Sequence, residues 1–327
     1  MTDASEGRGL LLLTEAEVAA LLPMPDLIRT LEDAFRAKAA GEATNQPRTR
    51  VVAAAGGVLH VMSAAWDAGG VMGLKAYTTG PGGARFVVHL YRTDGTPLAL
   101  MQADVLGQRR TGAATGLATR CMARPDAFAV AILGSGWQAR TQLEAVCAVR
   151  TIERATVYSR TPQRRERFAA EMSERLGVPV EAAPSAKGAV READIVCTIT
   201  SSRDPVLLGE WLEPGMHVNA AGVNWANRRE LDAEAVRRAA RVAVDDLAQA
   251  RVECGDLIWA ASEGAFAWGS AIELADVVAG RVVGRASPDE ITLFASQGIA
   301  LEDIAAAKLA YDNAIAGDIG RRFDLGS

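Results

Sequence analysis

The sequence predicts an α/β protein with two domains, in which a parallel-sheet domain is inserted into a domain built on an antiparallel sheet. The first observation is a set of five short β-branched or alternating segments between residues 48 and 103, separated by glycine-rich turns. Such a series is typical of an antiparallel meander. The second observation is the alternation of continuous apolar segments with helix-prone segments from residue 128 to residue 244, which is typical of βαβ units.

The first domain is predicted to open with two helices. Thr14 and the acidic residues that follow it form a helix cap. A second helix is expected over residues 25–40, because apolar residues recur there at a spacing of four, and Gly41 ends it. The strands of the meander are expected over residues 48–54, 58–63, 71–77, 85–91 and 98–103, and a long helix over 104–123 follows them.

The second domain is predicted to hold a parallel sheet with right-handed crossovers. Its strands are expected over residues 128–133, 155–159, 178–182, 195–199, 217–221, 241–244 and 291–295. A helix over residues 300–316 is expected to return to the first domain. We therefore predict one domain from residues 1–120 together with 300–327, and an inserted domain from residues 121–299.

Composition narrows the function. The chain has 327 residues, 49% of them hydrophobic, and a net charge of -5, so global disorder is excluded and nucleic acid is not an expected partner. Four distant cysteines predict free thiols in a reducing cytoplasm, and three histidines without zinc-ligand spacing predict no metal site. Apolar runs are too short to cross a bilayer, so we expect no membrane association.

A glycine-rich loop follows the first strand of the parallel region. The segment has the pattern GxGxxA, and its candidate cofactor-binding residues are Gly134, Ser135, Gly136, Gln138 and Ala139. The first glycine permits a tight turn, the second lets a pyrophosphate approach the backbone, and the small third residue lets helix and strand pack closely. Because this loop lies between a buried strand and a helix, it predicts a Rossmann-type NAD(P)-binding domain.

The end of the next strand indicates which nicotinamide cofactor binds. An acid about 20 residues beyond the loop would bind the ribose 2′-hydroxyl of NAD, but Ser159, Arg160 and Thr161 occupy that place. A guanidinium with hydroxyls suits a 2′-phosphate, so we predict NADP(H) in preference to NAD(H). The alternative is that the arginines here only solvate the start of a helix. Thr111 and Thr200 complete the candidate cofactor-binding residues.

Several motifs, spread in order over nearly the whole chain, resemble the ornithine cyclodeaminase/mu-crystallin family. They are Gly73-Leu74-Lys75, the segment 106–114 around Arg110-Thr111, the glycine loop, the segment 214–222, Arg229-Glu230-Leu231-Asp232 and the segment 290–298. The resemblance implies a homodimer, a substrate-binding and dimerisation domain beside the Rossmann domain, and an active site in the cleft between them. It also implies hydride exchange between nicotinamide and an imine at the α-carbon of an amino acid.

The resemblance also implies site residues. Lys75 matches the essential lysine of the family, and Arg110 matches the arginine of its Arg-Thr motif. A second carboxylate-binding arginine matches either Arg48 or Arg50, which lie two residues apart on one face of a strand. Chemistry is consistent with these roles, because two arginines clamp a carboxylate and a buried lysine has a lowered pKa suited to proton transfer.

Two positions depart from the cyclodeaminases of the family. Asn224 stands where they carry a carboxylate, and His60 stands in place of a second acid. Neither replacement is a strong base for the second ammonium group of ornithine. We therefore interpret Asn224 and His60 as substrate-binding residues of a branch that carries out redox chemistry only.

The predicted function is an NADPH-dependent reductase of cyclic ketimine carboxylates such as pyrroline-2-carboxylate or piperideine-2-carboxylate. The first alternative is an amino-acid dehydrogenase acting on an alanine-like substrate, and the second is ornithine cyclodeaminase. A protein that binds NADP(H) without turnover is disfavoured, because Lys75 and Arg110 are both present.

Overall fold

The computed structural model describes residues 9–324 and separates the chain into two compact units. One unit contains the residues up to Arg110 together with those from Ile299 onward, and the other contains Thr111–Gly298. The boundary falls inside helix α3 (Asp104–Met122). The C-terminal helix α11 (Ala300–Gly317) therefore belongs to the unit that the N-terminal half begins.

The first unit is built on a seven-stranded sheet with strand order β15-β1-β6-β5-β4-β3-β2. Strands β2 to β6 pair antiparallel with their chain neighbours, which confirms the predicted meander. Their bounds are β2 Ala43–Val52, β3 Val58–Trp66, β4 Val71–Thr79, β5 Arg85–Arg92 and β6 Pro97–Gln102. Strand β2 begins five residues before the predicted start, because a polar segment there also pairs with β3.

Two short strands at the other edge of this sheet were not predicted. Strand β1 (Leu10–Leu13) pairs parallel with β6, and β15 (Arg321–Phe323) pairs antiparallel with β1. A run of four leucines has no alternation of apolar and polar residues, so its sequence alone does not distinguish strand from helix.

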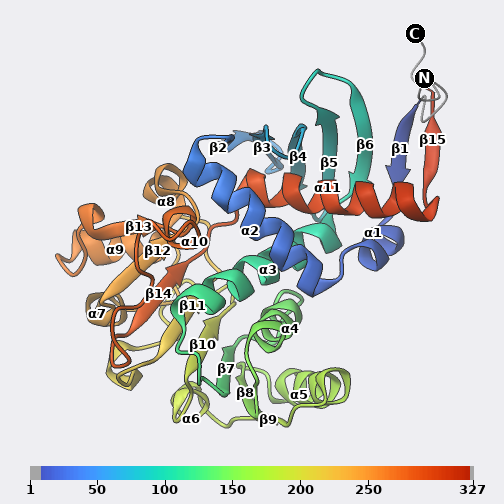
Figure 1. The fold of residues 1–327 in the computed structure, drawn as a ribbon. Coiled ribbons are helices and arrows are strands. Elements are labelled where there is room, and N and C mark those ends of the chain that lie inside the picture. Colours follow the sequence, from blue (N-terminus) through green and yellow to red (C-terminus); the bar gives the residue numbers. More distant parts are fainter. Residues whose placement is uncertain (1–8, 325–327) are drawn as a thin grey trace. The chain divides into compact units, whose positions relative to one another are not determined.

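Helices cover one face of this sheet. Helix α1 (Glu15–Leu21) begins with the predicted cap, in which the backbone N–H and the hydroxyl of Thr14 donate to Glu17 Oε2 at 2.8 and 2.7 Å. Helix α2 (Met24–Ala40) ends at Gly41, whose φ of 80° lies in the left-handed region that glycine adopts easily. Helices α2 and α11 pack against each other and against the strands, as Figure 1 shows.

The two faces of the sheet therefore differ. The register places His60, Tyr77 and Lys75 on the face that α11 covers, and all three side chains are buried. The other face carries several apolar residues that are exposed in this chain: Val51 is 66% exposed, Leu59 41% and Val87 38%. Successive residues of a strand point to opposite faces of the sheet. Alternate residues therefore lie either on the buried face with Lys75 or on the exposed face with Leu59.

The second unit contains an eight-stranded sheet with order β13-β12-β14-β11-β10-β7-β8-β9, in which every pair is parallel as predicted. The strands are β7 Ala129–Leu133, β8 Arg154–Tyr158, β9 Val180–Ala182, β10 Ile195–Thr198, β11 His217–Ala220, β12 Arg241–Val244, β13 Ala271–Glu273 and β14 Thr292–Ala295. The order reverses next to β7, and in open parallel sheets ligands bind outside the carboxyl ends of strands at such a point.

Helices lie on both faces of the parallel sheet (Figure 1). Their apolar side chains form two separate cores with the strands. One core is made with α4 (Ala139–Val149) and α5 (Pro162–Leu176). The other is made with α6 (Ala186–Val190), α7 (Ala233–Arg238), α8 (Leu247–Glu253) and α9 (Gly255–Ser262). Helix α10 (Leu274–Val278) and the single turns Gly209–Trp211 and Trp268–Ser270 complete the unit. Burial on both faces explains why strands such as β7 are continuously apolar.

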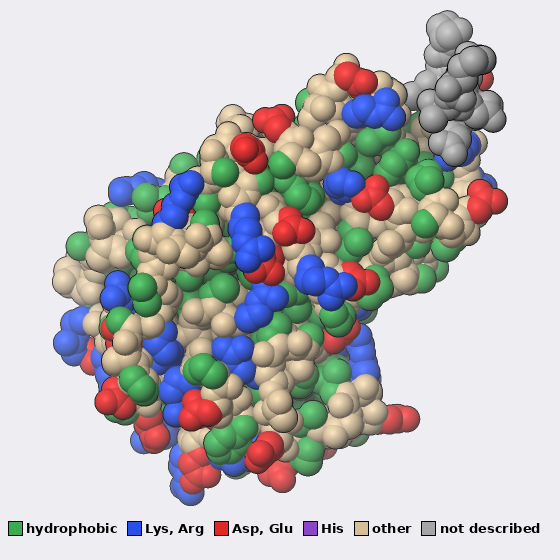
Figure 2. Space-filling model, viewed as in Figure 1, with side chains coloured by type: hydrophobic (Ala, Val, Ile, Leu, Met, Phe, Trp, Pro, Cys, Tyr) green, Lys and Arg blue, Asp and Glu red, His purple; other side chains and the backbone are tan. Residues whose placement is uncertain are grey.

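The surface carries charges of both signs. Figure 2 shows Lys and Arg side chains intermixed with Asp and Glu side chains over the visible face. Among the described residues, no helix is long and apolar enough to cross a membrane.

Candidate active site

The glycine loop of the second unit connects β7 to α4. Gly134 has a φ of 126°, and a Cβ at this position would lie 2.3 Å from the carbonyl oxygen of Ile199, so only glycine fits. Gly136 differs, because no described atom lies within 4 Å of the place where its Cβ would be. Ala139 starts α4 and is fully buried, which brings the helix close to the sheet.

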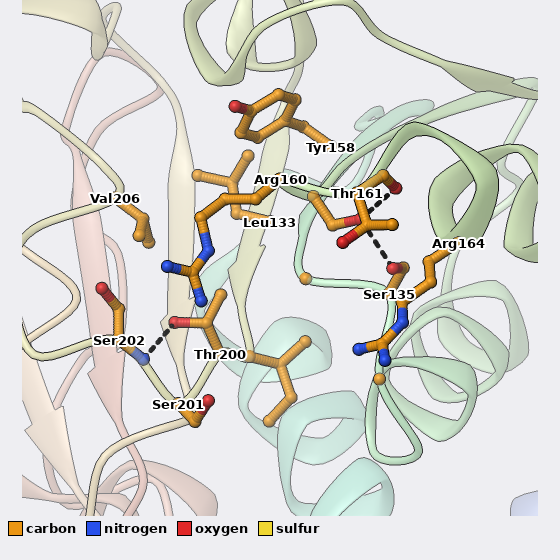
Figure 3. Close-up of a pocket in the computed structure, with 14 residues that line it drawn as sticks. Leu133, Ser135, Tyr158, Arg160, Thr161, Arg164, Thr200, Ser201, Ser202 and Val206 are labelled. Carbon is orange, nitrogen blue, oxygen red and sulfur yellow. Dashed lines mark hydrogen bonds between the residues drawn. The ribbon is translucent and has the colours of Figure 1, made fainter.

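A pocket of about 230 Å³ opens at this loop, between the carboxyl ends of β7, β8 and β10. The hydroxyl of Ser135 donates to Ser159 Oγ at 2.7 Å, which ties the loop to the end of β8. Figure 3 shows the guanidinium of Arg160 on the side of Thr200 and that of Arg164 on the side of Ser135. The pocket therefore combines hydroxyls with two cationic side chains and contains no carboxylate in its lining.

Glu230 fixes the backbone on the Thr200 side of this pocket. Its carboxylate accepts hydrogen bonds from Thr198 Oγ1 at 2.9 Å, from Gly222 N at 2.9 Å and from the backbone N–H of Thr200. Thr200 in turn lines the pocket. Complete burial, with nearby Asp256 also contributing, raises the pKa of Glu230 to about 7 in spite of these donors.

A buried ionic cluster occupies the covered face of the sheet in the first unit. Lys75 on β4 and Arg110 on α3 meet the start of α11 there. The oxygen Oδ1 of Asp303 accepts from Lys75 Nζ at 3.0 Å and from Arg110 Nε at 2.9 Å. The nitrogen Nη1 of Arg110 also donates to Glu302 Oε2 at 2.7 Å. Both carboxylates have no exposed surface, so these ion pairs are shielded from water.

The environment of Lys75 lowers its pKa to about 8. Burial is the main cause; the charge of Asp303 opposes it, and the positive charges of Arg110 and Arg48 add to it. The rings of Tyr77 and Phe86 lie 5.8 and 5.5 Å from the Lys75 ammonium. A lysine with these neighbours exchanges a proton near neutral pH, which an exposed lysine does not do.

The two candidate arginines of β2 lie in different surroundings. The pairing of β2 with β3 shifts between Gln46 and Thr49, and Arg48 lies within this irregularity. Arg48 is 7% exposed, whereas Arg50 is half-buried and pairs directly with His60. Of the two, Arg48 is the one whose charge acts on Lys75.

His60 is a neutral imidazole in this setting. Its ring stacks on Tyr77 with centroids 4.2 Å apart, and its Nε2 lies 3.0 Å from Thr79 Oγ1. Burial and the charges of Arg50 and Arg48 lower the pKa of His60 to about 4. His60 thus presents a flat, uncharged polar surface next to the arginines.

Glu302 and Asp303 were missed from the sequence, although they hold Lys75 and Arg110. Acidic residues in the first turn of a helix ordinarily stabilise the helix dipole at the surface. The signal that distinguishes them is the first half of this helix, residues 300–307, which is apolar apart from the two acids and completely buried. Acids at the start of such a helix must be buried too, and buried acids require cationic partners.

The remaining predicted residues lie in the second unit. Asn224 is half-buried in the segment after β11, and Thr111 is buried on α3. Gln138 is the residue before α4, and Thr161 is the residue before α5. The structure therefore gathers Arg48, Arg50, His60, Lys75 and Arg110 in one unit, and the candidate cofactor-binding residues with Asn224 in the other.

Comparison with known proteins identifies the family. The model of the ornithine cyclodeaminase/mu-crystallin family matches residues 10–318. The chain belongs to the ornithine cyclodeaminase/mu-crystallin family. This confirms the resemblance inferred from the motifs.

The similar proteins are oxidoreductases. A Delta(1)-pyrroline-2-carboxylate reductase of Bacillus cereus is 39% identical over 232 residues, which is 71% of each chain. The solved structure of the Thermococcus litoralis Delta(1)-pyrroline-2-carboxylate reductase, in complex with NADH and L-proline, is 37% identical with a TM-score of 0.91, over 96% of this chain and all of that one. An archaeal alanine dehydrogenase dimer with bound NAD is 34% identical with a TM-score of 0.90, over 97% and 99% of the two chains. This member of the family is thus an oxidoreductase of the class that acts on imines or amino acids.

The glycine loop of this family member fits a dinucleotide. Protein packing explains the glycine at position 134, because a side chain there would clash with Ile199. Packing does not explain Gly136, whose φ is ordinary and whose surroundings are open. Close approach of a bound group to the backbone does explain this glycine, because a side chain would block that approach. Among the described residues, no group of three or more His, Cys, Asp or Glu side chains forms a metal site.

Proposed function

We propose that this protein is an NADPH-dependent reductase of cyclic ketimine carboxylates, such as pyrroline-2-carboxylate or piperideine-2-carboxylate. The observation that carries the proposal is Lys75, a buried amine with a pKa near 8 that lies between a carboxylate and two guanidinium groups. An imine needs a proton on nitrogen and a hydride on carbon to become an amine, and Lys75 is a suitable proton donor. The pyrroline-2-carboxylate reductases to which the chain is similar support this substrate class.

The cofactor would be held by the second unit. The loop residues Gly134, Ser135 and Gly136, with the start of α4 at Gln138 and Ala139, would receive the pyrophosphate. Ser159, Arg160 and Thr161 would bind the 2′-phosphate of NADPH, and Thr111 and Thr200 would complete the site. When bound, the reduced nicotinamide supplies the hydride. NADPH is also the form that cells keep mostly reduced, which suits net reduction of an imine.

Lys75 would supply the proton. At neutral pH a group with a pKa near 8 is mostly protonated, so the Lys75 ammonium donates a proton to the imine nitrogen, directly or through one water. The C=N π bond breaks, the nitrogen gains the proton, and Lys75 becomes a neutral amine that recovers a proton from solvent. The rings of Tyr77 and Phe86 border the Lys75 amine.

The substrate carboxylate would be held by Arg110 and by one arginine of β2. Arg48 suits this role better than Arg50, because it is more deeply buried and acts on Lys75. Anchoring of Arg110 by Glu302 and Asp303 fixes its guanidinium, so less entropy is lost when a carboxylate binds. His60 and Asn224 would contact the remainder of the substrate, and neither can take the proton of a second ammonium group.

Oxidation of an amino acid is the second candidate function. The same clamp and the same lysine, starting as a neutral amine, would serve a dehydrogenase running in the opposite direction. Similarity to an archaeal alanine dehydrogenase favours this candidate specifically. Ornithine cyclodeaminase ranks below both, because Asn224 offers an amide where ring closure and ammonia release call for a base.

We further propose a homodimer in the cytoplasm. The apolar sheet face that includes Val51, Leu59 and Val87 is exposed in a single chain, and contact with a second copy would bury it. The archaeal alanine dehydrogenase to which the chain is similar is a dimer. All four cysteines are free thiols, which suits a reducing compartment.

A panel assay tests the proposed function. Oxidation of NADPH, followed by its absorbance, is measured with pyrroline-2-carboxylate, with piperideine-2-carboxylate and with pyruvate plus ammonia. In a separate arm, the enzyme is incubated with ornithine plus NAD or NADP and the proline formed is measured directly. We expect the cyclic imino acids to be reduced fastest. Faster turnover of pyruvate plus ammonia would instead identify an alanine-type dehydrogenase, and proline formed from ornithine would identify a cyclodeaminase.

A further inference from the structure

We propose that Asp303 is a positioning residue that keeps Lys75 protonated and in place for proton donation, while its neighbour Glu302 acts on the substrate-binding Arg110. The inference rests on the proposed function, since it concerns the same reaction. It assigns different tasks to two adjacent acids that look equivalent in the sequence. The two acids can be compared directly, because both lie in the first turn of α11 and both are completely buried.

The contacts separate the two acids. Asp303 Oδ1 lies 3.0 Å from Lys75 Nζ and 2.9 Å from Arg110 Nε, so a single oxygen joins the proton donor to the carboxylate clamp. Glu302 Oε2 lies 2.7 Å from Arg110 Nη1. A charge change at Asp303 should therefore affect Lys75 directly, whereas a charge change at Glu302 should affect the clamp first.

The other neighbours of Lys75 make Asp303 necessary. Arg110 on α3 and Arg48 on β2 are positive and disfavour a third positive charge. Asp104, at the start of α3, also interacts with Lys75, but it is exposed and shares its surroundings with Glu15. Of the carboxylates that Lys75 faces, Asp303 is the one in hydrogen-bond contact with its ammonium group, and this contact favours the charged form.

The space around the Lys75 amine limits its movement. A Cβ on Gly107 would lie only 2.9 Å from Nζ, so the amine packs closely against the first turn of α3. The two aromatic rings border it, and Asp303 holds it from α11. With the ammonium confined in this way, the hydrogen bond to Asp303 fixes the direction of the remaining N–H groups.

The experiment compares Asp303→Asn with Glu302→Gln. Each amide keeps a carbonyl acceptor and removes one negative charge, and the two changes are one residue apart. The readout is the pH dependence of kcat/KM for imine reduction, because this ratio reports groups of the free enzyme. Ionisation of the substrate affects all variants equally, so a difference between their profiles belongs to the protein.

We expect Asp303→Asn to move the alkaline limb of the profile to lower pH by about one unit or more, which lowers kcat/KM about fivefold or more at pH 8. Glu302→Gln is expected to raise KM for the imino acid while the alkaline limb stays where the wild type has it. NADPH binding, measured by fluorescence, should be unchanged in both variants and shows that each is folded. Equal profiles for Asp303→Asn and the wild type would overturn the inference, and so would the same shift in Glu302→Gln.

A second variant keeps the inference testable if Asp303→Asn does not fold. Asp303→Glu retains the negative charge but moves the oxygen by one methylene. We expect it to keep the wild-type position of the alkaline limb and to lose kcat through misplacement of Lys75. A shifted limb in Asp303→Glu would contradict the role of the charge. Failure of the wild type to reduce any imino acid would instead refute the proposed function. Failure of the inference and failure of the proposed function therefore give different results.

Discussion

Replacement of Arg160 by alanine gives a direct test of cofactor choice. Arg160 lines the pocket next to the glycine loop, at the end of the strand whose last residues lie beside the ribose in a Rossmann domain. Its guanidinium would contact the 2′-phosphate, which NADPH has and NADH lacks. We therefore expect Arg160→Ala to weaken NADPH binding and to leave NADH binding almost unchanged.

The magnitude follows from the surroundings of the side chain. A hydrogen bond to a charged group contributes about 1.5–3 kcal/mol. Arg160 is exposed and Arg164 lines the same pocket, so the lower part of this range applies. With about 1.4 kcal/mol for each factor of ten, the dissociation constant for NADPH should rise about tenfold to thirtyfold. The change for NADH should stay within about twofold, since the lost contact is absent in that complex.

The assay is a fluorescence titration of each variant with NADPH and with NADH. Arg167→Ala is the matched control, because Arg167 is exposed on α5, the helix that follows Arg160, and does not line the pocket. It removes the same charge and should alter both constants by less than about twofold. Raising the salt concentration should also reduce the preference for NADPH, because salt screens charges at exposed sites. Tighter binding of NADH than NADPH by the wild type would refute this reasoning, and so would equal losses for both cofactors in Arg160→Ala.

Three further changes test the other parts of the site. Lys75→Ala should lower turnover by about 10²–10⁴-fold while NADPH binding survives, and retention of more than about a tenth of the activity would exclude proton donation by Lys75. Asn224→Asp should raise KM for an anionic imino acid through charge repulsion, and an unchanged KM would remove Asn224 from the substrate site. Glu230→Gln concerns stability: the raised pKa of Glu230, about 7, means that the folded protein binds more protons than the unfolded chain between about pH 4.5 and pH 7, so stability falls as pH rises through this window. In Glu230→Gln the free energy of unfolding, measured with urea at several pH values, should fall less steeply across that window; an identical slope would show that Glu230 does not titrate there.

The fold was largely predictable because its signals are local. Each of these signals is contained in a segment of about 5 to 20 residues. They are the alternation along the strands, the glycines at the turns, and the continuous apolar strands followed by helices. The glycine loop is local as well, since Gly134, Gly136 and Ala139 lie within six residues of one another. The short strands β1 and β15 were missed because their pairing partners lie far away in the sequence and their own sequences lack a strand pattern.

Arg48 and Arg50 on β2 differ in a way that local sequence signals do not predict. By spacing alone, Arg48 and Arg50 are equivalent, because residues two apart on a strand share a face. The irregular pairing between Gln46 and Thr49 makes them different, since it leaves Arg48 nearly buried and Arg50 half-buried beside His60. Such a shift depends on how two strands fit together, which neither strand specifies by itself.

The sequence by itself therefore determined the two kinds of sheet, the place of the glycine loop and the presence of a lysine in an apolar strand. Only the tertiary structure determined which charged groups set the pKa and the position of that lysine. Asp303 lies 228 residues from Lys75 and 193 from Arg110, and only the return of α11 across the sheet brings its carboxylate to both. The physical reason is that a local pattern records whether a residue is apolar or polar, whereas the pKa of a buried charge depends on which charges meet it in space.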